Sequence, residues 1–251
     1  MTPDTDVTPV PAASITSWDD EADVVIAGYG IAGAAAAVEA ARAGADVLVL
    51  ERTGSWGGAA AMAGGFIYLG GGTALQKACG FDDSVDNMAA FLNVAMGPGA
   101  DVGRIADYCA GSVAHFDWLV DCGVPFKAEF FSEPGWEPMG DQGLMYSGGE
   151  NAYPFNTIAS PAPRGHVPQM SNKKQGEASA GYMLMKPLVE TATAAGARAL
   201  YDVRVQRLIV ESDGRVAGIS ARRYGAEINV RARRGVVLAM GSFAYNDAMV
   251  T

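Results

Sequence analysis

Hydrophobic residues near the start of this chain form short runs whose order is that of a β-strand, an α-helix and a second strand. Residues 23–27 (DVVIA) predict a buried strand, and the alanine-rich residues 34–43 predict a helix. A second apolar run, residues 46–50 (DVLVL), predicts the next strand. Strands that alternate with helices pair in parallel, so this βαβ unit predicts an α/β fold built on a parallel sheet.

Three further segments have the spacing of apolar residues that is typical of helices. They are residues 84–96, residues 102–122 and residues 182–195. Asp101 is a suitable N-cap for the second of them, and Gly123 is suited to end it. Pro187 predicts a local kink in the third.

Alternating apolar and polar residues in the last fifty positions predict an antiparallel β segment. Residues 203–211 and 215–222 are predicted strands, and the Asp-Gly pair within the turn at residues 212–214 favours a hairpin. Residues 227–233 predict a half-exposed strand. Residues 235–241 (GVVLAMG) predict a separate buried strand that leads into a glycine turn.

Two segments lack periodicity. Residues 1–20 are rich in Pro, Thr, Ser and Asp, which predicts a flexible tail before a domain that spans residues 21–251. Residues 126–176 combine many glycines, prolines and aromatic residues. A structureless loop of that length is uncommon, so this segment either lines a ligand site or contains short strands.

Composition and charge exclude several classes of function. The chain has 49% hydrophobic and 18% charged residues, as an ordinary globular protein has, and its net charge of −10 argues against nucleic acid or an anionic membrane as a partner. We expect a cytoplasmic protein, because no apolar run reaches the ~20 residues of a membrane-spanning helix and no signal-peptide pattern begins the chain. Cys79, Cys109 and Cys122 predict reduced thiols, and with only His115 and His166 present no metal centre is expected.

The residues between the first predicted strand and helix, GYGIAG at 28–33, carry the clearest chemical signal. Gly28 permits a sharp turn, Gly30 leaves room for a phosphate, and Gly33 lets the helix pack against the strand. Glu51 ends the next strand, eighteen residues after Gly33, close to where a ribose-binding carboxylate is expected. The pattern predicts a dinucleotide whose pyrophosphate lies at the helix N-terminus.

A second passage, residues 57–72 (GGAAAMAGGFIYLGGG), has seven glycines in sixteen residues. So many glycines do not favour a regular element, and they let the backbone bend tightly or lie against a flat ligand such as a flavin ring. The alternative is a low-complexity linker. The apolar residues Met62, Phe66, Ile67, Tyr68 and Leu69 favour contact with a ligand.

Four stretches together resemble the flavoprotein family that contains fumarate reductases and 3-ketosteroid dehydrogenases. They are GYGIAG, the strand ending VLVLER, the glycine passage and the late strand VVLAMGSFAYN. Within the family, GGFIYLGGGTALQ at 64–76 and GYMLMKPL at 181–188 are most similar to the delta-4 3-ketosteroid 5-alpha-dehydrogenases. The resemblance covers residues 21–251 and implies a Rossmann-like FAD-binding domain.

The resemblance also implies which residues contact FAD. Met240 and Ser242 depart from the Ala-Thr-Gly-Gly-Phe pattern of the family, so only backbone contacts are expected at that turn. The implied cofactor-binding residues are Gly28, Gly30, Ile31, Ala32 and Gly33 at the pyrophosphate; Glu51 at the ribose and Arg52 beside the adenine; Gly57, Gly58, Ala59 and Ala60 along the phosphates and ribityl chain; Met62, Ala63, Gly64 and Gly65 at the isoalloxazine edge; the Val205 backbone at the adenine; and Ala239, Met240 and Gly241 beside the cofactor.

For the reaction, the resemblance implies dehydrogenation of a 3-keto steroid, with hydride transfer to the flavin. A base must take a proton and an electrophilic group must polarise the ketone. The candidate side chains are Tyr68, Tyr146, Tyr153, Tyr182, Arg164 and His166. The family carries its catalytic residues mainly in a cap domain and a second flavin-binding segment that would follow Thr251, so the chain resembles the amino-terminal half of such an enzyme and its catalytic residues stay unknown.

Three functions remain open at this stage. The first is the steroid dehydrogenase, which the apolar stretch at residues 66–69 favours. The second is a fumarate reductase-like flavoprotein acting on a small dicarboxylate, and the third is a truncated flavin-binding module without catalytic activity. A nicotinamide-dependent enzyme would leave the second glycine passage unexplained. The electron acceptor and the oligomeric state are not predicted.

Overall fold

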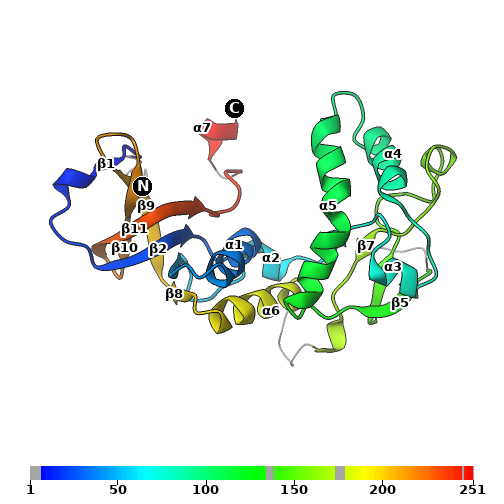
Figure 1. Ribbon diagram of the computed structural model, residues 1–251, viewed down its shortest axis with the longest axis horizontal. Helices are drawn as coiled ribbons and strands as arrows, with labels where there is room; N and C mark the ends of the chain where they lie inside the picture. The colour runs from blue at the N-terminus through cyan, green and yellow to red at the C-terminus, as the bar shows by residue number, and fades with distance from the viewer. Residues whose placement is uncertain (1–6, 134–137, 139, 173–178, 245, 251) are drawn as a thin grey trace. The chain divides into compact units, whose positions relative to one another are not determined.

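The computed structural model describes residues 7–133, 138, 140–172, 179–244 and 246–250. It divides into two compact units (Figure 1). The first unit comprises residues 1–60 and 188–251, and the second unit comprises residues 61–187. Each unit has a sheet and a buried core of its own.

A seven-stranded sheet with the order β1-β9-β10-β11-β2-β3-β8 forms the first unit. The pairs β11–β2, β2–β3 and β3–β8 are parallel, whereas β9–β10 and β10–β11 are antiparallel. This confirms the predicted parallel sheet with an antiparallel segment. The elements are β1 (Val10–Pro11), η1 (Ala12–Ser14), β2 (Asp20–Ala27), α1 (Ile31–Arg42), β3 (Val47–Leu50), β8 (Arg198–Leu200), β9 (Val203–Val210), β10 (Val216–Arg223), β11 (Ala226–Leu238) and α7 (Asp247–Val250).

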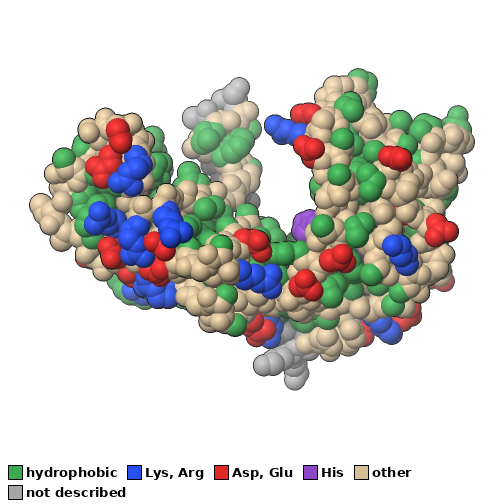
Figure 2. Space-filling view, in the orientation of Figure 1, with side chains coloured by type: hydrophobic (Ala, Val, Ile, Leu, Met, Phe, Trp, Pro, Cys, Tyr) green, Lys and Arg blue, Asp and Glu red, His purple; other side chains and the backbone are tan. Residues whose placement is uncertain are grey.

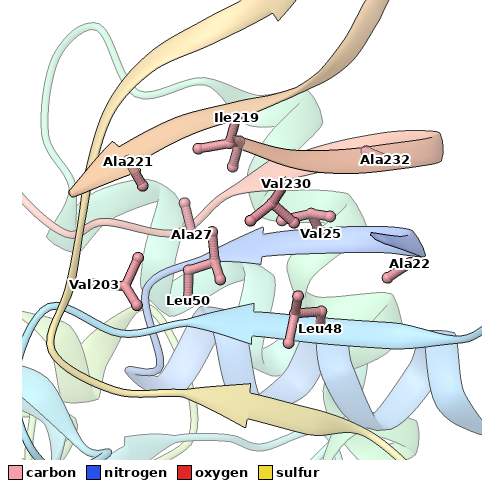
Figure 3. Close-up of a cluster of buried hydrophobic side chains, with 10 residues drawn as sticks. All are labelled: Ala22, Val25, Ala27, Leu48, Leu50, Val203, Ile219, Ala221, Val230 and Ala232. Atoms are coloured by element: carbon pink, nitrogen blue, oxygen red, sulfur yellow. The ribbon is translucent and has the colours of Figure 1, made fainter. Parts of the chain in front are cut away.

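The βαβ unit predicted from the sequence is present as β2, α1 and β3. Helix α1 buries Gly33, Ala34, Ala37, Val38 and Ala41, and these small side chains let it lie close to the strands. Aliphatic residues from five strands form the core of the sheet (Figure 3). They are Ala22, Val25, Ala27, Leu48, Leu50, Val203, Ile219, Ala221, Val230 and Ala232.

The antiparallel segment differs from the prediction at its last strand. Residues 227–233 and 235–241 were expected to form two strands, but one continuous strand, β11, spans Ala226–Leu238 with a register shift between Ala232 and Gly235. Strand β10 pairs with β11 only as far as Arg231, so the later residues pair with β2 alone. The expectation of a buried strand at residues 235–241 is wrong, because none of these residues is buried and Val237 and Leu238 are 37% and 55% exposed.

Part of the predicted flexible tail is paired with the sheet. Strand β1 pairs with β9, and the backbone N–H of Asp19 donates to Asn229 O at 2.8 Å. The ring of Trp18 lies over Gly218, where an added Cβ would come within 2.8 Å of it. The Pro- and Ser-rich composition does not reveal these contacts, because backbone hydrogen bonds and one aromatic ring provide them. Residues 1–6 lie outside the described residues, and the division into a tail and a single domain stays a prediction.

The second unit contains a four-stranded sheet with the order β4-β7-β6-β5. Three of these strands come from residues 126–176, so that segment contains short strands, as one of the two alternatives predicted. The elements are β4 (Ile67–Tyr68), α3 (Ala74–Ala78), α4 (Val85–Ala95), α5 (Val102–Asp121), β5 (Lys127–Phe131), β6 (Gln142–Met145), η2 (Phe155–Thr157), β7 (Gly165–His166) and η3 (Met170–Asn172). Helices α2 (Gly58–Met62) and α6 (Ala180–Ala194) run across the boundary between the units.

Helix ends in the second unit follow the capping rules. Ser84 accepts from Asn87 N at the start of α4, and Asp101 accepts from Arg104 N at the start of α5, which confirms the predicted cap. Gly123, with φ +86°, ends α5 as expected. Helix α6 continues through Pro187 and begins two residues before its predicted start. In the part of the chain that the structure describes, no helix has both the length and the apolar character needed to cross a membrane.

Ion pairs join the strands of the first unit at one end of β2. The guanidinium group of Arg233 pairs with three carboxylates. The distances are 3.1 Å from Nη1 to Glu21 Oε1, 2.9 Å from Nε to Asp23 Oδ1 and 2.9 Å from Nη2 to Asp46 Oδ2. Over the first unit, Arg side chains are intermixed with Asp and Glu side chains (Figure 2). The hydrogen bond from Arg233 is the main cause that lowers the pKa of Asp23 below its ordinary value.

We predict that Arg233→Gln lowers the melting temperature at pH 7 and that the difference narrows as the pH falls below about 4. A carboxylate with a lowered pKa in the folded state contributes stability above its unfolded pKa, and this contribution is lost as the pH falls through the folded pKa. Thermal melts of both proteins between pH 7 and pH 3 measure the effect. Arg204→Gln, on an exposed position of β9, is the control. A difference in melting temperature between the variant and the parent protein that is as large at pH 3 as at pH 7 would contradict the assignment of this stability to the Arg233–Asp23 pair.

Candidate functional site

Two close backbone contacts shape the first glycine loop, residues 28–33. Neither contact leaves room for a side chain on the glycine. Gly28 has φ +100°, and a Cβ added there would overlap the carbonyl oxygen of Ala239. A Cβ added to Gly33 would overlap the carbonyl oxygen of Gly28. The loop is therefore closed by backbone packing between the start of α1 and the ends of β2 and β11.

Gly30 plays a different part, because space is open around it. It is the N-cap of α1, and no side chain caps the helix there. The first turn of α1 has no acidic residue, and Ile31 and Ala32 are exposed. Backbone N–H groups at the start of this twelve-residue helix can therefore donate to an anion, which the helix dipole also attracts.

The beginning of the second glycine passage lies beside Gly30. A Cβ added to Gly30 would be 3.9 Å from Gly57 O, and one added to Gly58 would be 3.7 Å from the Cα of Gly30. The N–H of Gly57 donates to Tyr29 O at 2.9 Å. Two bare stretches of backbone, 27 positions apart in the sequence, thus face each other at the helix N-terminus.

Glu51 lies at the end of β3 and is bonded to the same loop. Its Oε2 accepts from the backbone N–H of Tyr29 at 2.7 Å, and its Oε1 accepts from the N–H of Thr53 at 2.8 Å. Oε1 also accepts from Thr53 Oγ1 at 2.9 Å, so Oε2 is the oxygen with a further lone pair that can accept from a sugar hydroxyl. Arg52 follows in an exposed position. The side chain of Tyr29 is buried, and burial raises its pKa to about 12.

The late turn, residues 239–241, reaches this loop because β11 pairs in parallel with β2. The N–H of Ala239 donates to Ala27 O at 2.8 Å, directly before Gly28. Met240 is 61% exposed, and Gly241 has φ +85°. In β9, the partly buried side chain of Val205 packs against the core, and its backbone is paired with Ala221 of β10.

The residues predicted at the isoalloxazine edge belong to the second unit. Met62 is 75% exposed. The carbonyl oxygen of Ala63 accepts from Gly181 N at 3.0 Å, and a Cβ on Gly65 would be 2.6 Å from the carbonyl carbon of Ala180. The start of α6 therefore fixes this segment. Ala59 and Ala60 lie in α2, and Gly64 is partly buried between Ala63 and Gly65.

The last part of the glycine passage, residues 69–72, contacts the protein's own side chains. The predicted contact with a ligand is therefore wrong for this part. The N–H groups of Gly70, Gly71 and Gly72 donate to Ser112 Oγ, Asp83 Oδ2 and Gln76 Oε1 at 2.8, 3.0 and 3.0 Å. Leu69 is fully buried in a hydrophobic cluster. The Thr73–Gln76 capping box can be recognised in the sequence and indicates part of this hydrogen-bond network. Nothing in the sequence indicates that Ser112 takes part in it.

Two of the candidate catalytic side chains have structural roles. Arg164 is fully buried and donates twice to Asp83, from Nε at 2.9 Å and from Nη2 at 2.8 Å. His166 is fully buried, with Nε2 2.9 Å from Thr73 Oγ1 and Nδ1 3.0 Å from Arg164 O. Burial lowers the pKa of His166 to about 4, so the ring is neutral at physiological pH.

Two of the four candidate tyrosines, Tyr68 and Tyr146, lie near Glu150 and Arg164, whose charges act on the pKa of each phenol. Burial raises the pKa of Tyr68 and of Tyr146 above the ordinary value, which disfavours the phenolate that a base would need. Tyr153 is 82% exposed, and Tyr182 lies in α6. The catalytic residues therefore stay unassigned. Among the described residues, Cys79, Cys109 and Cys122 form no disulfide, and there is no group of three metal-ligating side chains.

This geometry fits a dinucleotide. The open helix start offers N–H donors to a pyrophosphate, the two glycine stretches leave room for it, and Glu51 offers acceptors for ribose hydroxyls. The family model of the FAD binding domain matches residues 23–251.

Similar proteins agree with this match. The chain is 34% identical to the 3-oxo-5-alpha-steroid 4-dehydrogenase of Comamonas testosteroni. The alignment spans 223 residues and covers 85% of this chain and 40% of that protein. Its sequence is 71% identical to that of a 3-ketosteroid-delta4-(5alpha)-dehydrogenase from Rhodococcus jostii RHA1, whose crystal structure was solved in complex with 4-androstene-3,17-dione. The two structures superpose with a TM-score of 0.92, and the match covers 96% of this chain and 50% of that one. A flavocytochrome c3 fumarate reductase, 24% identical, shares the fold with a TM-score of 0.71 over 93% of this chain and 36% of that one.

The chain spans 40% of the length of the Comamonas relative and half of the Rhodococcus chain. The family match extends over most of the sequence and includes both glycine stretches, Glu51 and the late turn. The chain belongs to the FAD-binding-domain family, and its cofactor is FAD.

Proposed function

We propose that this protein is an FAD-dependent oxidoreductase that dehydrogenates a 3-keto steroid at a CH–CH bond. The observation that carries the proposal is the 71% identity, over 96% of the chain, to the Rhodococcus jostii enzyme that was solved with 4-androstene-3,17-dione. Similarity of this degree over the cofactor-binding region supports a shared cofactor geometry.

We further propose how the chain binds FAD. The N–H groups at the start of α1 bind the pyrophosphate beside Gly30 and Gly58, and Glu51 accepts from the adenosine ribose. The exposed Arg52 and the Val205 backbone lie at the adenine. The remaining contacts follow the two glycine stretches and the late turn, at Gly28, Ile31, Ala32, Gly33, Gly57, Ala59, Ala60, Met62, Ala63, Gly64, Gly65, Ala239, Met240 and Gly241.

When bound, FAD supplies the ring that accepts a hydride from the substrate. The chain's own residues at the proposed isoalloxazine edge, residues 62–65, position that ring. Met62 and Phe66 are exposed apolar side chains near the segment fixed by α6, and they suit an apolar substrate. This observation favours a steroid over a dicarboxylate.

We also propose a cytoplasmic location. Three cysteines that form no disulfide among the described residues, Cys79, Cys109 and Cys122, are typical of a reducing compartment and support this assignment.

We predict that Glu51→Gln weakens FAD binding by about 10- to 100-fold, because a charge-assisted hydrogen bond to the ribose is lost. Quenching of flavin fluorescence on titration with the apoprotein measures the dissociation constant, and circular dichroism checks the fold. Glu39→Gln, at an exposed position of the same βαβ unit, is the matched control. Equal affinities for the Glu51 variant and the parent protein would remove Glu51 from the site.

We predict that a saturated 3-keto steroid bleaches the yellow absorbance of the FAD-loaded protein made from the full-length reading frame, because hydride transfer reduces the flavin. Fumarate added to the chemically reduced protein should leave it colourless. Stopped-flow absorbance under nitrogen follows both reactions. Reoxidation by fumarate would favour the fumarate reductase alternative, and a yellow protein that responds to neither compound would favour a non-catalytic flavin-binding module.

A further inference from the structure

Thr53, two positions after Glu51, binds one oxygen of the Glu51 carboxylate with two groups. Its backbone N–H and its Oγ1 lie 2.8 and 2.9 Å from Glu51 Oε1. The other carboxylate oxygen, Oε2, accepts from Tyr29 N at 2.7 Å, inside the first glycine loop. A carboxylate offers about four acceptor positions, and these three bonds leave one of them, on Oε2. Oε1 is therefore occupied by Thr53, and Oε2 is the oxygen left to a ligand at the loop.

The backbone on both sides of Thr53 is held by the chain that connects β8 with β9, so its hydroxyl has a defined place. The N–H of Glu51 donates to Leu200 O at 2.9 Å, and Glu51 O accepts from Val203 N at 2.8 Å. Thr53 O accepts from Asp202 N at 3.2 Å. Thr53 is exposed, whereas Glu51 is buried. The hydroxyl thus bonds to a buried carboxylate although solvent is within its reach.

The proton of the Thr53 hydroxyl has two acceptors within reach. Oγ1 lies 2.9 Å from Glu51 Oε1 and 2.7 Å from Ser55 O, and a hydroxyl donates only once. Donation to Glu51 is favoured, because a charged acceptor forms the stronger hydrogen bond. Donation to Ser55 would also turn a lone pair of Oγ1 toward the negative charge of Glu51. The hydroxyl therefore donates to the carboxylate.

We propose that Thr53 is a positioning residue for the adenosine ribose of FAD: it holds Oε1 of Glu51, so that Oε2 is turned toward the ribose. The terminal torsion of a glutamate side chain is broad, so a carboxylate that is held through one oxygen can rotate. With both oxygens held, the free acceptor position is in place before the cofactor binds, and less freedom is lost on binding. The inference rests on the proposed ribose contact of Glu51 and is independent of the substrate that the enzyme oxidises.

Thr53→Val removes the hydroxyl and keeps the backbone N–H and the shape of the side chain. We expect FAD to bind about 3- to 10-fold more weakly to the apoprotein made from the full-length reading frame, because one hydrogen bond to a charged group is lost at an exposed position. Thr53→Ser should restore the affinity. Ser55→Ala, which removes an exposed hydroxyl from the same turn, is the control and should bind FAD as the parent does.

Quenching of flavin fluorescence measures the dissociation constant of FAD, and circular dichroism checks the fold. ADP carries the same ribose and pyrophosphate without the flavin. In competition with FAD, it should lose affinity for the Thr53→Val protein by the same factor as FAD. A loss of affinity for FAD with none for ADP would overturn the proposal, because the hydroxyl would then act away from the ribose.

A double variant shows whether Thr53 acts through Glu51. In a Glu51→Ala background, Thr53→Val should have no further effect on the affinity for FAD, because the hydroxyl has no carboxylate to hold. An equal effect with and without Glu51 would overturn the proposal and assign the hydroxyl to Ser55 O. If the Glu51→Ala protein does not fold, Thr53→Ser decides, and an affinity as low as that of Thr53→Val would overturn the proposal.

The outcome also separates this inference from the ribose contact on which it rests. A Thr53→Val protein that binds FAD as tightly as the parent, while Glu51→Gln binds it more weakly, would overturn only the role of Thr53. Parent-like affinity in the Glu51→Gln protein would overturn the ribose contact of Glu51 together with the role of Thr53.

Discussion

Close backbone packing at Gly28 and Gly33 is the constraint on which the nucleotide end of the first unit depends. Helix α1 can begin against the ends of β2 and β11 only because neither position carries a side chain. The parallel pairing of β2 with β11 and with β3 then brings Ala239 and Glu51 to the same loop. Three segments that are far apart in the sequence thereby meet at one helix N-terminus. Since that N-terminus has no side-chain cap, its N–H groups remain available to an anion.

Much of the first unit could be predicted from the sequence, because local signals determine it. The apolar runs predicted β2 and β3, and the glycine spacing predicted the loop at residues 28–33. The Asp-Gly turn predicted the hairpin of β9 and β10. The short strands at residues 127–131, 142–145 and 165–166 could not be predicted in the same way. A strand of two to five residues contains too few positions to show an alternating pattern, and its partners come from distant segments.

The polar core of the second unit shows a second limit of sequence analysis. Glycine density alone does not reveal whether bare backbone faces a ligand or the protein's own side chains. Gly57 and Gly58 face the open helix start, whereas Gly70–Gly72 donate their N–H groups to Ser112, Asp83 and Gln76. Arg164 and His166 have residue types suited to catalysis, but their burial and their partners assign them to the same core. Only the three-dimensional contacts distinguish the two uses.

The central claim is that the two glycine stretches and Glu51 hold one FAD molecule at the start of α1. A crystal structure of the FAD-loaded protein tests it most directly. The account predicts that pyrophosphate oxygens accept from the first backbone N–H groups of α1, between Gly30 and Gly58, and that the adenosine ribose lies at Glu51. A pyrophosphate bound elsewhere, with the helix start facing only solvent, would contradict it.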